Sequence, residues 1–247
     1  MPQYQPSPSL LQHTLADIVT ADVRTAAVLD RAGLDYCCHG HQTLEDAAAA
    51  KGVSAAAVLA ELDTLGPAAP ADRTIGLEAE LDALTEHIMA THHAYVREAA
   101  PRIQGWLEKL AARHGDRHPE LREIRATFDW LSRDLGAHMI KEENILFPHI
   151  DALAAASRAG GRLPASPFGT ILNPIGMMEE EHRHAGDQLE SLRRLTRDYT
   201  PPEDGCTTYR LCYEELARFE GDLHRHVHAE NNVLFPRAIE LEREFGS

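Results

Sequence analysis

The sequence is poor in aromatic residues and has no long apolar run. Phe, Trp and Tyr make up 6% of its 247 residues, and no stretch that alternates between apolar and polar residues stands out. No apolar run approaches the roughly 20 residues that a membrane-spanning helix needs. A strand-rich fold and a membrane span are therefore disfavoured. The abundance of Ala, Leu, Glu and Arg, together with few β-branched residues, predicts an all-α protein.

Positive charge is also scarce. The 24 Lys and Arg residues are outnumbered by 39 Asp and Glu residues, which gives a formal net charge of −15. Because an acidic chain is repelled by phosphate backbones, nucleic-acid binding is disfavoured. Residues 1–9 are polar and proline-rich and lack a basic segment followed by an apolar one, so we expect no secretion signal.

The cysteine content is low, and two of the four cysteines, Cys37 and Cys38, are adjacent. This number does not suggest a disulfide framework, and we expect a cytoplasmic protein in a reducing environment. Adjacent cysteines do not easily form an unstrained disulfide. The pair is either two small buried apolar residues or a functional thiol pair. Cys206 and Cys212, near the start of the last predicted helix, are expected to be packing residues.

The first part of the chain, residues 1–66, is predicted to be a small helical domain. Helical spacing of apolar residues covers 15–32, and Gly33 is a plausible helix stop. Thr43 and Ser54 are typical N-cap residues and predict two further short helices.

A linker and a larger helical domain are predicted to follow. The composition Gly-Pro-Ala-Ala-Pro indicates a linker, which we place at 67–74. Residues 75–247 are predicted to form a four-helix bundle, because they contain long segments with apolar stripes at helical spacing. These segments are 76–113, 119–154, 174–198 and 207–243.

One motif occurs twice in the predicted bundle. Residues 138–148 and 226–236 both read His-x3-Glu-x-Asn-x-Leu-Phe-Pro, and the two copies lie 88 residues apart. Each copy is preceded by a histidine at nearly the same offset, His93 by 45 residues and His182 by 44 residues. This internal repeat predicts two similar helix hairpins related by a pseudo-two-fold axis.

The repeated motif places histidine and glutamate on apolar helix faces. His138 and Glu142 share one face of the second long helix, as His226 and Glu230 share one face of the fourth. A carboxylate is expensive to bury unless it is paired or binds a metal, and neither stripe supplies a Lys or Arg. Mixed imidazole and carboxylate ligands suit iron, manganese or zinc. Two facing half-sites suggest two metals bridged by the two carboxylates.

Other histidines fit the pattern less well. Periodicity does not separate His92 from His93, but the repeat offset favours His93. His114 has no counterpart in the repeat and by itself predicts a surface residue. His149 is also expected not to bind metal, but it is the one exception to watch, because it continues the apolar stripe of its helix. The histidines that we expect not to bind metal are His87, His118, His184, His224 and His228.

These motifs resemble the hemerythrin-like di-iron proteins and, more narrowly, the repair-of-iron-centres family of iron–sulfur cluster repair proteins. In that family a small domain with adjacent cysteines precedes a hemerythrin-like four-helix bundle. The resemblance covers nearly the whole chain. The matching segments are Leu34 to Cys38, Ser132 to Pro148, Met177 to His182, Thr200 to Pro202, Cys206 to Thr208 and His226 to Pro236.

The resemblance implies two non-haem iron ions. Glu142 and Glu230 match the carboxylates that bridge the irons, together with an oxo or hydroxo group. One position departs from the family, which usually has glycine after the cysteine pair where this chain has His39. His39 adds a possible ligand and changes the backbone angles that are accessible there. The ligands that the resemblance implies are His93, His114, His138, Glu142, His182, His226 and Glu230.

The function that the resemblance implies is repair of iron–sulfur clusters damaged by nitrosative or oxidative stress, through iron donation, nitric oxide handling or both. Cys37 and Cys38 would pass iron or a nitrosyl group onward. The expected partners are damaged iron–sulfur proteins and nitric oxide, with no nucleic acid and no membrane, and the chain is expected to be a monomer or homodimer. Three alternatives are a nitric oxide or peroxide reductase, a hemerythrin-type oxygen binder or sensor, and a structural bundle that binds zinc or manganese.

Overall fold

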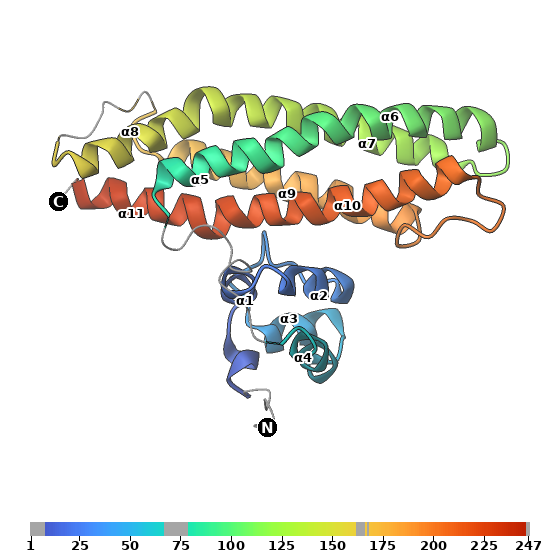
Figure 1. Cartoon of the computed structure of the whole chain (residues 1–247), viewed down its shortest axis with the longest axis horizontal. Coiled ribbons are helices and arrows are strands. Elements are labelled where there is room, and N and C mark those ends of the chain that lie inside the picture. Colours follow the sequence, from blue (N-terminus) through green and yellow to red (C-terminus); the bar gives the residue numbers. More distant parts are fainter. Residues whose placement is uncertain (1–7, 67–78, 162–165, 167, 246–247) are drawn as a thin grey trace. The chain divides into compact units, whose positions relative to one another are not determined.

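The computed structural model describes residues 8–66, 79–161, 166 and 168–245. All regular elements in this part of the chain are helices, and its extended pairing is limited to an isolated bridge between Thr14 and Thr43 (Figure 1). The predicted all-α class is confirmed. The linker expected at 67–74 lies outside the described residues. Among the helices of these ranges, none combines the length and the apolar character that a membrane span requires.

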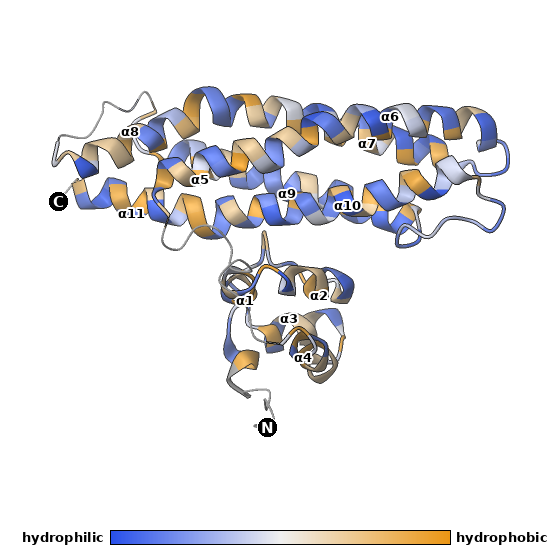
Figure 2. Ribbon diagram, viewed as in Figure 1, coloured by the Kyte–Doolittle hydropathy of each residue, from blue (hydrophilic) through white to orange (hydrophobic). Residues whose placement is uncertain are grey.

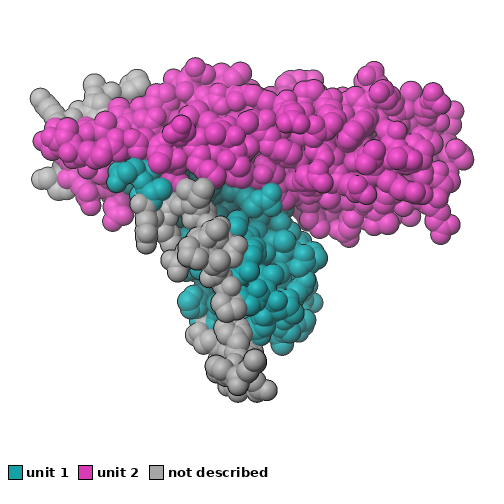
Figure 3. All heavy atoms as spheres, in the orientation of Figure 1, with its two compact units in different colours: residues 1–80, 224–237 teal, residues 81–223, 238–247 magenta. Residues whose placement is uncertain are grey.

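The chain divides into two compact units (Figure 3). The smaller comprises residues 1–80 and 224–237, and the larger comprises residues 81–223 and 238–247. The sequence placed 224–237 with the bundle, whereas its contacts in the structure group it with the N-terminal residues.

The smaller unit contains a 3-10 turn, Pro8–Gln12, and short helices. Side-chain caps begin three of these helices, because the hydroxyl oxygens of Thr14, Thr43 and Ser54 each accept a backbone N–H from the first turn. The caps expected at Thr43 and Ser54 are therefore confirmed. The helices are α1 (Leu15–Ala21), α2 (Thr25–Ala32), α3 (Leu44–Lys51) and α4 (Ala55–Asp63).

The single helix expected over 15–32 is in fact two helices. Asp22 adopts an extended conformation, with φ −154°, and ends α1. Its carboxylate accepts hydrogen bonds from the guanidinium of Arg24, and its carbonyl oxygen accepts one from Thr25 Oγ1 at 2.6 Å. These local bonds compete with continuation of the helix. Gly33 ends α2 with φ +67°, as predicted for a glycine C-cap.

The segment 224–237 is held in the smaller unit by polar side chains. Asn232 Nδ2 donates to the carbonyl oxygens of Tyr36 at 3.2 Å and Cys37 at 3.0 Å. His228 Nε2 lies 3.2 Å from Thr20 Oγ1, and His224 pairs with Asp30 at 2.7 Å. The Tyr36 ring also contacts both of these histidine rings edge to face.

The larger unit consists mainly of long helices. Amphipathic character is visible along them as interspersed apolar and polar residues (Figure 2). Two pairs of helices, α5 with α6 and α7 with α8, are each joined by a five-residue π-helical turn, so each pair follows one predicted long helix. The helices are α5 (Leu81–Ile88), α6 (Ala94–His114), α7 (Glu120–Lys141), α8 (Phe147–Arg158), α9 (Leu172–Leu195), α10 (Thr207–Ala229) and α11 (Phe235–Phe245). The last two helices extend across both units, and a third π-helical turn joins them.

The core of the larger unit is apolar, and two of its buried carboxylates are paired with arginines. Phe128 of α7 packs edge to face on Phe219 of α10. The buried Glu215 of α10 accepts a 2.6 Å hydrogen bond from Arg102 of α6, and Glu220 pairs with Arg193 of α9. Such pairing is what makes buried carboxylates tolerable. Helix α6 continues through Pro101 without interruption.

The close packing of Gly40 yields a stability prediction. A Cβ atom at this position would lie 2.5 Å from the Tyr36 carbonyl oxygen and 2.8 Å from Asn232 Oδ1. We therefore expect Gly40→Ala to lower the free energy of unfolding by about 1–3 kcal/mol, as overpacked sites do. Chemical denaturation measures this change.

A matched control is Gly105→Ala in α6, where a Cβ would meet nothing within 4 Å. That substitution should raise the free energy of unfolding by about 0.5–1 kcal/mol, because alanine loses less conformational entropy in a helix. Equal effects at both positions would contradict the packing assigned to Gly40.

Candidate metal centre

Four of the predicted ligands come together in the larger unit. His138 and Glu142 lie one turn apart at the end of α7, and Glu142 Oε1 is 3.1 Å from His138 Nε2. The other oxygen, Oε2, is 3.3 Å from Nε2 of His93, which follows α5. His182 of α9 brings its Nε2 to 3.0 Å from that of His138. All four side chains are buried, and Glu142 has no exposed surface.

This arrangement has the properties of a metal site. His138, Glu142 and His182 each offer a ligand atom, and these atoms lie within 4.8 Å of one another. Imidazole nitrogen and carboxylate oxygen are ligands that iron, manganese and zinc accept. The cluster can therefore hold a cation in a buried part of the bundle.

The second copy of the motif has the same internal geometry and belongs to the smaller unit. His226 Nε2 lies 2.9 Å from Glu230 Oε1, and both side chains are buried. The pair thus repeats the His138–Glu142 relationship, as the sequence repeat predicts.

Three π-helical turns coincide with predicted ligands. The turn Met89–His93 ends at His93, Glu142–Leu146 begins at Glu142, and Glu230–Leu234 begins at Glu230. The π-helix is rare, occurs mostly as single turns inside α-helices, and is frequent at functional sites. Its recurrence at three predicted ligands indicates that the local backbone is adapted to orient these side chains.

Two further carboxylates, which the sequence analysis did not identify, orient the histidines. Glu143 Oε1 lies 2.7 Å from His93 Nδ1, and Glu181 Oε2 lies 2.8 Å from His138 Nδ1. When Nδ1 carries the proton and donates it to the carboxylate, Nε2 keeps a lone pair for a metal. Each of these two glutamates is the sequence neighbour of a predicted ligand, because Glu143 follows Glu142 and Glu181 precedes His182. That position is the feature by which the sequence could have identified them.

Basic residues keep these two carboxylates charged. Burial raises the pKa of Glu143, but hydrogen bonds from Arg97 and His93 outweigh it and leave the pKa below its usual value. Burial likewise raises the pKa of Glu181, and hydrogen bonds from Lys141 and His138 more than offset that effect. Each carboxylate can therefore accept the Nδ1–H hydrogen bond of its histidine at neutral pH.

His114 is not brought to the cluster, which corrects the ligand set expected from the resemblance. It ends α6, and that helix begins directly after His93. At 1.5 Å per residue the two positions are separated by about 30 Å. The His114 ring instead packs edge to face on Tyr209, with ring centroids 5.8 Å apart.

Two other histidines are accounted for by local contacts. His92 is buried, and its Nδ1 lies 3.1 Å from Asp222 Oδ1, which leaves His93 as the residue directed at Glu142. His149 packs edge to face on Phe168, and burial lowers its pKa. Neither residue joins the described cluster around Glu142.

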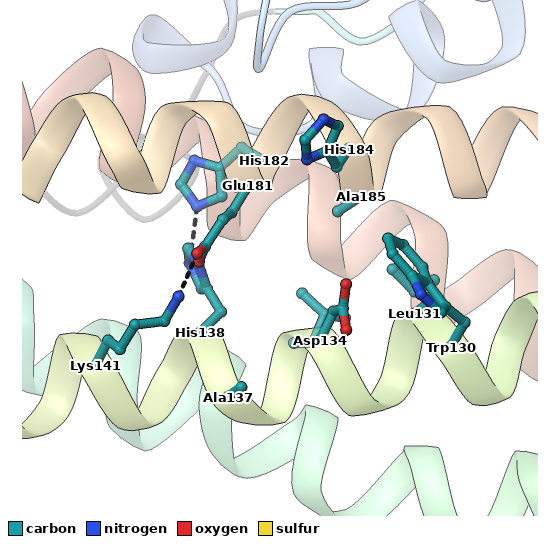
Figure 4. Close-up of a pocket in the computed structure, with 11 residues that line it drawn as sticks. Trp130, Leu131, Asp134, Ala137, His138, Lys141, Glu181, His182, His184 and Ala185 are labelled. Atoms are coloured by element: carbon teal, nitrogen blue, oxygen red, sulfur yellow. Dashed lines mark hydrogen bonds and ion pairs between the residues drawn. The ribbon is translucent and has the colours of Figure 1, made fainter.

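A pocket gives access to the edge of the cluster (Figure 4). Its volume is about 300 Å³, and it lies between α7 and α9. His138 and His182 line it together with Lys141 and Glu181, which form an ion pair. Trp130, at 40% exposure, also lines it. The pocket is large enough for a small molecule to approach His138 and His182.

The adjacent cysteines lie in the smaller unit, in the loop between α2 and α3. All four cysteines are free, and Cys37 is buried while Cys38 is partly exposed. The pKa of Cys37 is raised well above its usual value by its hydrogen bond to Cys38, by burial and by the negative charge of Asp35. Cys212 is buried, as expected for a packing residue, but Cys206 is exposed, so that expectation was wrong for Cys206.

The hydrogen bond between Glu181 and His138 yields a prediction about metal affinity. Replacing such a carboxylate typically weakens metal binding about 10- to 100-fold, because the imidazole loses its orientation and basicity. We expect Glu181→Gln to weaken the binding of ferrous iron by this factor, measured by competition with a chelator. Glu180→Gln is the matched control, because Glu180 is exposed and pairs with Arg183 on the same helix. Equal affinities in the two variants would contradict the role assigned to Glu181.

Comparison with known proteins places the chain in a family. A model described as the hemerythrin HHE cation binding domain matches residues 84–238, and one described as a domain of unknown function, DUF542, matches residues 11–66. The chain is 35% identical to the iron-sulfur cluster repair protein YtfE of Musicola paradisiaca, over 94% of this chain and 98% of the relative. It is 36% identical to the YtfE protein of Enterobacter sp. (strain 638), over 91% and 96% of the two chains. For the Escherichia coli O157:H7 protein of the same name, the identity is 34% over 91% and 96%. The chain therefore belongs to the YtfE family of iron–sulfur cluster repair proteins, which carries a hemerythrin HHE cation-binding domain.

Proposed function

We propose that this protein repairs iron–sulfur clusters damaged by nitrosative or oxidative stress, using iron held in a di-iron centre. The observation that carries the proposal is the buried cluster of His93, His138, Glu142 and His182 in the bundle. The relatives named above as iron-sulfur cluster repair proteins match this chain over nearly its full length. The proposed ligands are His93, His138, Glu142, His182, His226 and Glu230.

The two oxygens of Glu142 support a bridging role for this residue. Oε1 faces His138 and Oε2 faces His93, so each oxygen is directed at a different imidazole. A carboxylate that bridges two metal ions presents its oxygens in this way. His138 and His182 would therefore help to hold one iron, and His93 would help to hold the other.

The internal repeat assigns the remaining ligands. His182 corresponds to His93 in the repeat, and His226 corresponds to His138. His138 and His182 lie together, so by the pseudo-two-fold relation in the sequence His226 and His93 would hold the second iron. Glu230 corresponds to Glu142 and would be the second bridging carboxylate.

Such a centre supplies labile iron and a binding site for nitric oxide. The protein's own residues prepare the site: Glu143 and Glu181 hold His93 and His138 in the tautomer that can bind metal. The pocket beside His138 and His182 admits a small molecule such as nitric oxide. Cys37 and Cys38 would receive iron or a nitrosyl group and deliver it to damaged iron–sulfur proteins. The four free cysteines fit a reducing compartment such as the cytoplasm.

The pocket also favours a second candidate function, the reduction of nitric oxide or peroxide at the same centre. A volume of about 300 Å³ accommodates either molecule next to His138 and His182. Repeated turnover with an electron donor would favour this enzyme activity, whereas one repair event per bound iron would favour iron donation.

Metal content tests the proposed ligand set. We expect about two irons per chain in protein purified without oxygen, as a centre with two bridging carboxylates requires. His138→Ala should lose iron, because His138 lies at the centre of the cluster. His114→Ala should keep both irons, because His114 lies at the other end of α6. Zinc alone, or at most one metal after iron loading, would contradict the di-iron proposal.

The role of the cysteine pair is tested by repair of a purified iron–sulfur enzyme damaged by nitric oxide. Substituting both Cys37 and Cys38 by serine should abolish repair and leave the iron content of the bundle unchanged. Cys206→Ser is the matched control, because Cys206 is an exposed free thiol in the larger unit. If the double variant repaired the enzyme at the wild-type rate, the proposed transfer through these thiols would be wrong.

A further inference from the structure

We propose that Asp35, Cys37 and Cys38 form a second metal site, which binds one thiophilic divalent cation apart from the histidine and glutamate ligands. The assignment of ferrous iron as the cation in the cell rests on the proposed function. The site itself rests on the geometry of the loop between α2 and α3. Asp35, Cys37 and Cys38 each offer a ligand atom, and these atoms lie within 4.8 Å of one another.

The sulfur atoms are spaced for a shared metal ion. Cys37 Sγ and Cys38 Sγ are 3.9 Å apart. Two thiolates bound at about 2.3 Å to one tetrahedral ion lie about 3.8 Å apart. The bonded sulfurs of a disulfide are only about 2.05 Å apart. The observed spacing of the two sulfur atoms thus fits one cation bound to both of them.

The carboxylate of Asp35 fixes the backbone of the cysteine loop and lies next to the sulfur of Cys37. Its Oδ1 accepts the backbone N–H groups of Cys37 at 3.1 Å and Cys38 at 2.8 Å, and it lies 3.2 Å from Cys37 Sγ. For a tetrahedral ion, an oxygen and a sulfur ligand lie about 3.6 Å apart. A shift of a few tenths of an ångström therefore completes a site with two sulfurs and one oxygen.

His39 positions the carboxylate. Its Nδ1 lies 2.6 Å from Asp35 Oδ2, so a proton shared there fixes the orientation of the Asp35 side chain. Metal-binding carboxylates commonly have such a hydrogen-bonded partner. Cys38 and His39 are both accessible to solvent, so a cation can enter and leave without unfolding of the loop.

The loop is tied to the segment that carries the proposed ligand Glu230. Asn231 and Asn232 follow Glu230 directly, and both side-chain amides donate to the Cys37 carbonyl oxygen, at 3.4 Å and 3.0 Å. In the first copy of the motif, Asn144 instead donates to Ile140 O of its own helix at 2.8 Å. The two asparagines at the same motif position therefore have different roles, and the second fixes the position of the cysteine loop.

Cobalt binding tests this site directly. Full-length protein with its iron already bound is titrated with Co²⁺ under reducing, oxygen-free conditions. Thiolate ligands give cobalt a charge-transfer absorption in the near ultraviolet that histidine and glutamate ligands do not give. We expect this absorption to saturate at about one cobalt per chain, as a single site requires. Its absence in the wild-type protein would overturn the proposal.

Variants identify the ligands. Cys37→Ser and Cys38→Ser should each abolish or strongly shift the absorption, and Asp35→Asn, which keeps an oxygen to accept the backbone N–H groups, should weaken cobalt binding at least about tenfold. Cys206→Ser should leave it unchanged, and persistence of the absorption in both loop cysteine variants would overturn the proposal.

The outcomes separate this site from the proposed function. Cobalt binding with undiminished repair by the double cysteine variant would retain the site and reject the transfer. If the double cysteine variant lost repair and the wild-type protein gave no cobalt–thiolate absorption, the metal site would be rejected and the transfer through the thiols would be retained.

Discussion

The burial of Glu142 among histidine rings is the constraint on which the bundle depends. A carboxylate removed from water loses several kcal/mol of hydration energy, which cationic partners must replace. Glu215 and Glu220 in the same unit meet this requirement with arginines, whereas both oxygens of Glu142 face imidazole nitrogens. Metal ions between these groups are the partners that fit such a ligand set. The packing of the Met89–His93 turn, α7 and α9 then follows, because each must bring its histidine to the same depth in the core.

The residues around this cluster are charged, and each is paired with a neighbour. Glu143 and Glu181 bind the outer nitrogens of His93 and His138, and they are in turn paired with Arg97 and Lys141. Glu143 and Glu181 therefore lie between the buried histidines and the more exposed basic residues Arg97 and Lys141. This order keeps each histidine in one tautomer and leaves its inner nitrogen directed at Glu142. The pocket is lined by the Lys141–Glu181 ion pair as well as by His138 and His182.

In the smaller unit, the second copy of the ligand motif also holds the backbone of the cysteine loop. Both copies of the motif retain an asparagine two residues after the glutamate, but only Asn232 holds the Tyr36–Cys37 backbone. Gly40 makes this contact possible, because a side chain there would collide with the Tyr36 carbonyl oxygen and with Asn232. The cysteine pair is thus joined by hydrogen bonds to the segment that carries Glu230, one of the proposed iron ligands.

The sequence by itself determined the helices, the two copies of the ligand motif and the choice of His93 over His92. The helices depend on local spacing, because apolar periodicity and N-caps act within a few residues. The choice of His93 depends on its offset from His138 in the internal repeat. Only the tertiary structure decided the partners of those residues. It showed that Glu143 and Glu181 orient the histidines, that His114 lies a whole helix away, and that Asn232 reaches the cysteine loop. Such contacts join residues far apart in the chain. They depend on which helices pack together and on how far each helix is shifted along its axis relative to its neighbour.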